Sequence, residues 1–357
     1  MGFKCGIVGL PNVGKSTLFN ALTSSKNAQA ENFPFCTIDP NIGIVDVPDN
    51  RLNNLSVISK SVKKINANMT FVDIAGLVKG ASKGEGLGNK FLSHIREVDA
   101  IIHLVRCFDS ENIQHVNKKI DPINDLETIK TEILLADIKQ IEKKLEKNSK
   151  KKLTEKQIKL LKDILDRLNK AETINMSYDT ESKKFITEIG LISNKPYIIV
   201  CNVDEQSVLN GNRYTKLLKE KYPNQKLISI CADIESQIID LKPEERENYM
   251  KNIGLEKTGL DKLITSGYDL LDLNTFFTSG PKETRAWTIK KNTEAQKAAG
   301  VIHSDFEKNF IRAEVVSYDD FEKYGSFEKA KENGKLRVEG KSYFVKDGDI
   351  LIFRVNP

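Results

Sequence analysis

Eight residues near the start of the chain have the types and spacing needed to hold phosphate groups. They read GLPNVGKS from Gly9 to Ser16 and fit the pattern G-x-x-x-x-G-K-S. An apolar run ends at Val8 and a helical pattern begins near Lys15, which is the strand–loop–helix context that this motif requires. Glycines let backbone N–H groups curl around phosphate oxygens, and the positive end of the helix points at them. This context favours a phosphate-binding loop (P-loop) over a chance glycine-rich turn.

Two side chains of the P-loop are expected to act on a bound nucleoside triphosphate. The Lys15 ammonium should reach the β- and γ-phosphates, which makes it a candidate catalytic residue, and the Ser16 hydroxyl should bind Mg²⁺. Mg²⁺ is therefore the cofactor that the motif predicts. The residues of this segment that are expected to contact the nucleotide are Asn12, Val13, Gly14, Lys15, Ser16 and Thr17.

Further contacts to Mg²⁺ and the γ-phosphate are predicted downstream. Asp73 closes a β-rich run, and an Asp at this place in P-loop hydrolases usually holds Mg²⁺. Gly76 completes the pattern D-x-x-G, and its amide is expected to sense the γ-phosphate. Between the two motifs, Thr37 is expected to close over Mg²⁺ as part of a switch segment, in preference to Thr23 at the end of the P-loop helix. An ordinary loop is the alternative for that segment.

A second polar segment, which follows another buried run, is expected to contact the nucleotide base. It reads NVDE from Asn202 to Glu205, where GTPases carry N-K-x-D. In those proteins the Asp accepts two hydrogen bonds from guanine, and the Lys stem covers the base. Here Val203 replaces the Lys and Glu205 replaces the Asp, and the longer carboxylate cannot keep the same two-bond geometry. Loss of the Asp that recognises guanine favours ATP as the nucleotide. A GTPase in which Glu205 takes the role of that Asp is the alternative.

The loop after the next apolar run, 227–230, is expected to offer backbone groups to the same base. A structural strand end is the alternative interpretation. The base-contacting residues expected from the two segments are Asn202, Val203, Glu205, Cys231 and Ala232.

The chain lacks the residue that positions the attacking water in many related hydrolases. A Gln often follows D-x-x-G and orients that water, but Leu77 stands here and has no hydrogen-bonding group. His115 lies in a polar loop just after the apolar run 100–105, at an edge where ligands bind in open α/β sheets. It is the candidate base or water orienter, with a solvent-exposed histidine as the alternative.

The composition excludes several classes of protein. The chain has 357 residues, a net charge of +5 and 39% apolar residues, which is ordinary for a globular protein of two or three domains. No apolar run approaches the length of a membrane span, and the first residues lack the layout of a signal peptide. The five cysteines are odd in number and dispersed, so neither a disulfide framework nor a zinc site is indicated. We expect a cytoplasmic protein with no membrane contact, and a monomer.

Apolar stripes at helical spacing predict an antiparallel helical hairpin inserted at 130–188. The two stripes are Leu134, Ile138, Ile141 and Leu145, then Ile158, Leu161, Leu165 and Leu168. A polar break at 148–152 separates them. Lys and Arg outnumber Asp and Glu in this region, which suits either RNA phosphate or a solvated helix face.

The last part of the chain predicts a separate α+β domain with a ubiquitin-like layout. Residues 274–281 break the preceding pattern. A helix is expected near 295–299, and strands at 285–290, 311–316, 335–338, 343–346 and 350–355. Such modules bind RNA or protein, and Trp287 on the first strand is expected in the core rather than as a stacking platform for bases.

These motifs together resemble the YchF family, also called Obg-like ATPases. The segments that carry the resemblance are the P-loop, NFPFCTIDPN at 32–41, DIAGLVKGASKGEGLGN at 73–89 and NVDE at 202–205. The resemblance runs from Phe3 to the C-terminus. It implies an α/β P-loop (Rossmann-like) G domain over 1–273, interrupted by the helical insertion at 130–188, and a C-terminal TGS domain over 274–357.

The resemblance also implies activity and partners. It implies ATP-directed or relaxed nucleotide specificity, ribosome association, and His115 in place of the missing Gln. Related hydrolases with Asn at the position of Asn12 use K⁺ beside the phosphates, so K⁺ is a further expected cation. The large ribosomal subunit, rRNA and tRNA are the expected partners of the helical insertion and the TGS domain.

The resulting hypothesis is an ATPase that slowly hydrolyses ATP with Mg²⁺ and acts on the ribosome as a switch. The alternatives are an Obg-type GTPase and a ribosome- or RNA-binding adaptor in which the nucleotide is mainly structural. A phosphoryl-transferring kinase is less favoured, because no lid for an acceptor is evident.

Overall fold

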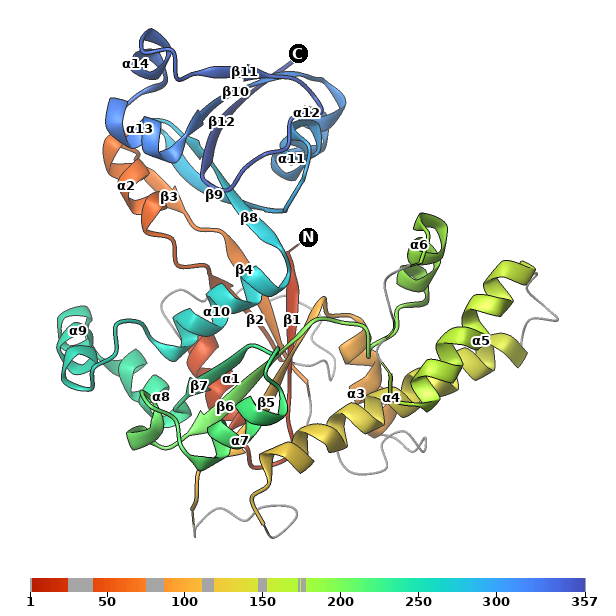
Figure 1. Cartoon of the computed structure of the whole chain (residues 1–357). Coiled ribbons are helices and arrows are strands. Elements are labelled where there is room, and N and C mark those ends of the chain that lie inside the picture. Colours follow the sequence, from red (N-terminus) through yellow and green to blue (C-terminus); the bar gives the residue numbers. More distant parts are fainter. Residues whose placement is uncertain are drawn as a thin grey trace. The chain divides into compact units, whose positions relative to one another are not determined.

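The chain forms two compact units, each with its own core. The computed structural model describes residues 2–24, 41–74, 87–110, 119–146, 153–172, 174 and 178–356 (Figure 1). The N-terminal unit comprises Phe3–Gly43 and Thr70–Leu260. The C-terminal unit comprises Ile44–Met69 and Asp261–Pro357, together with Met1–Gly2. The expected domain boundary after residue 273 stays a prediction.

The N-terminal unit is built on a six-stranded sheet with the order β2-β4-β1-β5-β6-β7. Its strands are β1 Lys4–Val8, β2 Asn41–Asp46, β4 Asn68–Asp73, β5 Ala100–Cys107, β6 Tyr197–Val203 and β7 Leu227–Ile230. The pairs β1–β4, β1–β5, β5–β6 and β6–β7 are parallel. Every residue of β5 is buried, as in parallel sheets that helices cover on both faces. The boundary between the two units falls within β2 and β4.

Helices follow the strands of this unit in turn. They are α1 Lys15–Ser24, α3 Leu87–Arg96, α4 Pro122–Glu146, α5 Glu155–Asn169, α6 Thr180–Ile189, α7 Arg213–Lys221, α8 Ala232–Asp240 and α9 Pro243–Asn252, with α10 Gly259–Leu270 crossing the unit boundary. One hydrophobic cluster holds α4 and α7 against the sheet through Val105, Leu126, Ile199 and Leu218. In the part of the chain that the structure describes, no helix combines the length and the apolar character needed to cross a membrane.

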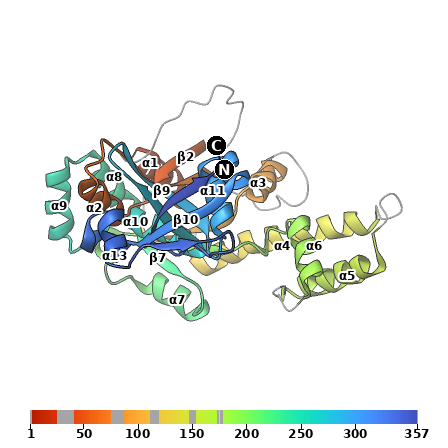
Figure 2. The same cartoon turned by 90° about the horizontal axis from the view of Figure 1, so that it is seen from above.

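The predicted helical insertion is present and has a third helix. The second half of α4 packs with α5 and α6 around one cluster, and we call these three the helical arm (Figure 2). Seven of the eight predicted stripe residues belong to this cluster, and Ile158 does not. Thr154 begins α5 in a capping box with Gln157, which satisfies backbone N–H groups that a helix start leaves free. Gly190 ends α6 at φ 68°, a left-handed angle that glycine adopts without strain.

The C-terminal unit has a second six-stranded sheet with the order β11-β10-β12-β8-β9-β3. Its strands are β3 Lys63–Ile65, β8 Leu273–Ser279, β9 Glu283–Lys290, β10 Phe310–Ser317, β11 Arg337–Glu339 and β12 Asp349–Val355. Its helices are α2 Asn50–Ile58, α11 Ala295–Ile302, α12 Ser304–Lys308, α13 Tyr318–Tyr324 and α14 Phe327–Glu332. Side chains of α11 pack on this sheet in the core, and Trp287, predicted in the core, is partly buried against it.

Two expectations for this region are wrong. The segment 274–281 was expected as an irregular break, but most of it forms β8 between β12 and β9. Its polar Thr275 is buried, and the Tyr268 hydroxyl 2.9 Å away satisfies the Thr275 hydroxyl in place of water. The segment 343–346 was expected as a strand, but it makes one isolated bridge, between Phe344 and Glu294. The helices α13 and α14 were not foreseen.

The segment Ile44–Met69 belongs to the C-terminal unit, although it lies far away in sequence. Its strand β3 pairs in parallel with β9, Lys63 opposite Glu283, and so becomes the last strand of the sheet. The hydroxyl of Ser61 donates to the carbonyl of Gly280 at 2.8 Å and lies 2.7 Å from that of Thr284. This sheet is therefore complete only when residues from before β4 join those at the end of the chain.

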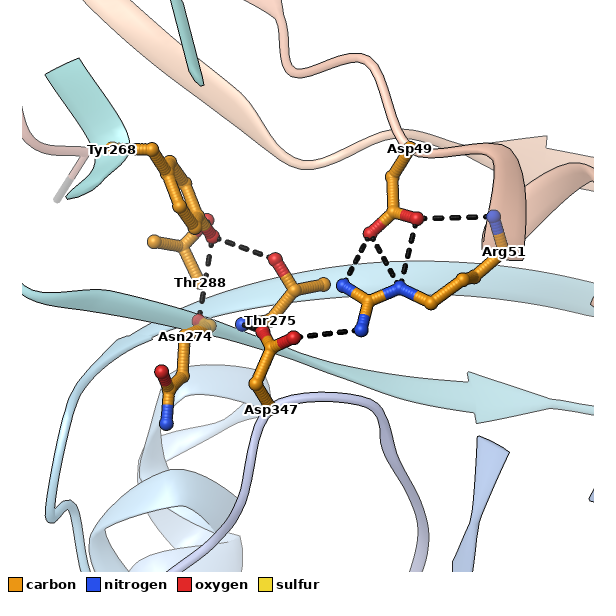
Figure 3. Close-up of polar contacts among 7 residues, drawn as sticks. All are labelled: Asp49, Arg51, Tyr268, Asn274, Thr275, Thr288 and Asp347. Atoms are coloured by element: carbon orange, nitrogen blue, oxygen red, sulfur yellow. Dashed lines mark hydrogen bonds and ion pairs between the residues drawn. The ribbon is translucent and has the colours of Figure 1, made fainter. Parts of the chain in front are cut away.

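Arg51 joins the start of α2 to the other end of the chain (Figure 3). Asp49 caps α2 by accepting from the Arg51 backbone at 3.0 Å, and its carboxylate also accepts from the Arg51 guanidinium at 2.7 Å. The same guanidinium donates to Asp347 at 2.7 Å, and Asp347 accepts from the Thr275 backbone at 2.8 Å. The cap of α2, the loop before β12 and strand β8 thus share one polar network.

We expect Arg51→Met to destabilise the C-terminal unit, because Asp49 and Asp347 would both lose a charged hydrogen-bond donor. Hydrogen bonds to charged groups typically contribute about 1.5–3 kcal/mol, and the loss should fall in that range. Calorimetry of the full chain measures it. Arg312→Met is the matched control, because Arg312 is about half exposed and pairs only loosely with Glu314. Equal effects of the two substitutions would contradict the role given to Arg51.

Candidate functional site

The P-loop has the conformation that its motif predicts. It leaves β1 after Val8, and α1 begins at Lys15. Gly14 has a φ of 92°, and Asn12 a φ of 65°, so both lie in the left-handed region. A Cβ atom at Gly14 would also collide with the amide nitrogen of Asn202. Glycine is therefore required at residue 14 by its backbone angle and by its neighbour.

A cavity of 420 Å³ lies over this loop, and we call it the phosphate cavity. Its lining residues are Leu10, Pro11, Asn12, Gly14, Lys15, Ser16 and Thr17. The backbone N–H groups at the start of α1 have no partners within the helix, and they favour a negative charge here. The predicted phosphate contacts of the P-loop, apart from Val13, thus share one cavity.

Lys15 and Asp73 meet beside the phosphate cavity. Strand β4 pairs with β1 so that Asp73 stands opposite Ile7, just before the P-loop begins. The Lys15 ammonium donates to the Asp73 carboxylate, and the two side chains are 12% and 11% exposed. The Asp73 carboxylate and the Ser16 hydroxyl are hard oxygen donors of the kind that Mg²⁺ prefers. The residues present therefore fit Mg²⁺ beside bound phosphate.

Asn202 fastens the P-loop to a second loop of the site. Its amide nitrogen donates to the carbonyl of Val13 at 2.9 Å, and its amide oxygen accepts from the backbone of Ala232 at 3.1 Å. The side chain is 5% exposed, so these bonds form away from water. Asn202, Val13 and Ala232 are each predicted nucleotide contacts, and in this structure their hydrogen bonds hold the P-loop and the start of α8 to one another.

A second cavity, of 620 Å³, shares Asn12, Gly14 and Thr17 with the phosphate cavity. We call it the base cavity. Its other lining residues are Phe108, Asp109, Ser110, Asn202, Val203, Asp204, Glu205, Cys231, Ala232 and Asp233. Because the two cavities share residues, phosphates over the P-loop would leave a nucleoside within reach of the base cavity. All five predicted base contacts line it.

The carboxylates of the NVDE segment have different surroundings. The Asp204 carboxylate accepts from the backbone and the hydroxyl of Ser207, at 3.0 and 2.8 Å, and caps the short 3₁₀ turn Glu205–Ser207. The side chain of Glu205 is exposed. Val203 is 2% exposed and packs in the hydrophobic cluster of α4 and α7, so it does not cover a base as a lysine stem does.

The turn after β7 contributes backbone groups rather than a reactive side chain. Cys231 precedes the first residue of α8 and makes no side-chain cap. Burial raises the pKa of its thiol, which disfavours the reactive thiolate form. Cys231 and Ala232 therefore offer the base cavity a helix start.

Three predicted site residues fall outside the described residues. They are Thr37, Gly76 and His115, and Leu77 also lies there. Their proposed roles stay predictions.

Sequence reasoning missed Phe108, Asp109, Ser110 and Asp233, which line the base cavity. The first three follow the carboxyl end of β5, and the NVDE segment spans the carboxyl end of β6. Ligands in open parallel sheets bind beyond the carboxyl ends of the strands, and this signal could have found them.

Asn202→Asp tests the bond between the loops with an almost unchanged side-chain shape. The carboxylate cannot donate to Val13, and it places a negative charge against that carbonyl. We expect the full chain to lose about 1–3 kcal/mol of stability, as when a buried hydrogen-bonding partner is removed. Thermal unfolding measures this, with Asn333→Asp as the control, because the exposed Asn333 also donates to a carbonyl. Similar losses in both variants would contradict a special role for Asn202.

Two family models match the chain. The model described as 50S ribosome-binding GTPase matches residues 4–137, and the model YchF-GTPase_C, described as a protein of unknown function, matches residues 273–356. The first match includes the P-loop and Asp73, and the second includes the strands β8 to β12.

Full-length relatives and a solved structure extend these matches. The chain is 48% identical to the Ribosome-binding ATPase YchF of Bacillus subtilis (strain 168) over 366 aligned residues, which cover 100% of both chains. It is also 48% identical to the protein of the same name from Haemophilus influenzae, again over 100% of both. The structure of the Schizosaccharomyces pombe YchF GTPase superposes with a TM-score of 0.87 at 36% identity and covers 99% of this chain and 98% of that one. On this identity and coverage, the chain belongs to the YchF family.

Proposed function

We propose that this protein binds ATP with Mg²⁺, hydrolyses it slowly to ADP, and uses its nucleotide state to control binding to the ribosome. One observation carries the proposal: the phosphate cavity, with Lys15 and Asp73 beside it, continues into a base cavity where Val203 and Glu205 stand at the positions of the Lys and Asp of N-K-x-D. The relatives named Ribosome-binding ATPase YchF support both parts of the proposal.

The charges beside the phosphate cavity suit phosphoryl transfer to water. Lys15 would contact the β- and γ-phosphates and offset the negative charge that develops as the bond between them breaks. Ser16 and Asp73 would hold Mg²⁺, which supplies further charge neutralisation to the phosphate oxygens when it is bound. The amide of Gly76 and the hydroxyl of Thr37 would respond to the presence of the γ-phosphate.

Water activation is the weakest part of this machinery, and slow turnover is therefore expected. Leu77 follows the D-x-x-G pattern and cannot orient a water molecule. We propose that His115 accepts the proton of the attacking water, or orients that water, in its place. Asn12 at its place in the P-loop supports K⁺ as a second cation beside the phosphates.

The base cavity supports ATP over GTP. Guanine needs an acceptor that takes two hydrogen bonds from its N1–H and N2–H₂ groups. Asp204 lies one position out of register and caps the turn Glu205–Ser207, and Glu205 stands at the register of the usual Asp with a longer side chain. A site without a carboxylate placed to accept both guanine hydrogen bonds loses its preference for guanine over adenine, because that preference depends on those bonds.

Ribosome binding is proposed from the relatives' names and from the charge balance of the helical insertion in the sequence. Residues 137–172 carry more Lys and Arg than Asp and Glu, and these basic side chains would meet RNA phosphate. We propose the large subunit as the ribosomal contact, with rRNA or tRNA meeting the arm and the C-terminal unit, and a monomer acting in the cytoplasm.

Titration of the nucleotide-free protein with ATP and with GTP tests which nucleotide the protein prefers. Each nucleotide is titrated alone and then in competition with the other, always in the presence of Mg²⁺. We expect ATP to bind at least tenfold more tightly, a difference of about 1.4 kcal/mol. Lys15→Met should weaken both nucleotides, because it removes a phosphate contact and leaves the base cavity intact. A preference for GTP would instead support an Obg-type GTPase.

Hydrolysis and ribosome binding are tested together in a second experiment. His115→Ala should lower the rate of ATP hydrolysis by about a hundredfold, the usual scale for a general base, and leave ATP affinity unchanged. Wild-type protein should sediment with ribosomes to a different extent in ATP and in ADP. His115→Ala should keep the extent of sedimentation seen in ATP for longer, because it hydrolyses ATP more slowly. Nucleotide-independent sedimentation without turnover would support an adaptor instead of a switch.

A further inference from the structure

One side of the base cavity is a turn that no nucleotide motif predicts. Phe108, Asp109 and Ser110 line the cavity, and we call them the base wall. They leave the sheet directly after β5, which ends at Cys107. Turns at such an edge usually move more than the strands that carry them. The contacts of the base wall, however, hold it from two sides.

The first side is held by Arg106, whose side chain is among the largest that are fully buried, at 1% exposure. Its Nε donates to the carbonyl of Phe108 at 3.1 Å, and its Nη2 donates to the carbonyl of Ser110 at 3.3 Å. Its Cζ also lies 4.7 Å from the centre of the Phe108 ring. A buried guanidinium is stable only when its donors are used, and here two of them fix the first and last residues of the base wall.

The second side is held by the first turn of α7. Asn212 donates to the carbonyl of Cys107 at 2.6 Å, while its amide oxygen caps α7 by accepting from the backbone of Tyr214 at 3.0 Å. The Tyr214 hydroxyl donates to the Asp109 carboxylate at 2.6 Å, and Arg213 donates to the same carboxylate at 2.9 Å. The start of one helix therefore fixes both the end of β5 and the middle of the base wall.

We infer that Arg106 and Tyr214 are positioning residues for the nucleoside, which act through the base wall without lining the base cavity themselves. A wall that is already fixed does not lose conformational freedom when a ligand binds, so more of the contact energy appears as affinity. The inference rests on the proposed function, because it assigns a role in nucleotide binding. It adds two residues that lie in neither the P-loop nor the NVDE segment.

Two ligands separate this role from a structural one. ATP would use both cavities, whereas inorganic tripolyphosphate carries the phosphates alone and would use only the phosphate cavity. With Mg²⁺ present, Tyr214→Phe should weaken ATP about fivefold, the scale of one hydrogen bond, and Arg106→Met about tenfold or more. Both variants should keep the wild-type affinity for tripolyphosphate within about twofold, so the ratio of the two affinities falls.

Tyr318→Phe is the matched control, because Tyr318 also donates its hydroxyl to a carboxylate, that of Glu322 at 2.6 Å, in the C-terminal unit. It should leave both affinities unchanged. Thermal unfolding of each variant shows whether the chain is folded, and if Arg106→Met is not, Tyr214→Phe alone decides, since it removes one oxygen atom.

The outcomes separate this inference from the proposed function. An unchanged ratio of ATP to tripolyphosphate affinity in Tyr214→Phe overturns the inference, and so does a parallel loss of both ligands, which would mean a general structural effect. If the wild-type protein binds tripolyphosphate as tightly as ATP, the base cavity takes no part in binding. In that case the proposed function fails first and the inference fails with it.

Discussion

The site depends on one side-chain amide that is used at both ends. Asn202 lies near the carboxyl end of β6, donates to the P-loop at Val13 and accepts from the helix start at Ala232. Each of these three loops begins at the end of a different parallel strand, and the sheet alone fixes only where they begin. The amide also occupies the space that a side chain at Gly14 would need, so the glycine of the motif and the asparagine are required together. The phosphate cavity and the base cavity therefore have a common rigid frame.

The arrangement of residues at the phosphate end could be predicted from the sequence because it depends on spacing along the chain. A strand, a glycine-rich loop and a helix stand in immediate succession, and Asp73 reaches Lys15 through the pairing of β4 with β1. The base wall could not be predicted in the same way. It is held by Arg106 and by residues of α7, and the pairing of Tyr214 with Asp109 joins positions 105 residues apart. Comparing NVDE with N-K-x-D shows that Glu205 has a longer side chain than the Asp of the motif. The comparison could not reveal that Asp204 caps a turn.

The C-terminal sheet shows the same limit at the level of the fold. Most of its strands alternate clearly in sequence, but β8 contains Thr275 and other polar residues that hide its strand character. Its buried Thr275 hydroxyl has a partner only in the folded chain, where Tyr268 supplies it. Strand β3 has three residues, Lys63–Ile65, too few to give a periodic pattern. Its place beside β9 follows from a pairing between distant parts of the chain, and propensity and spacing carry no information about such a pairing.

The interleaving of the two units also sets an order of events during synthesis. Helix α2 and strand β3 are made early, but β9, with which β3 pairs, begins at Glu283. At about 5–20 residues per second, the intervening part of the chain takes roughly 10–40 s to make. Throughout that time the apolar face of α2, including Leu52 and Leu55, has no finished sheet to cover it. The C-terminal unit is thus the last to close, even though its first residues are among the earliest to emerge.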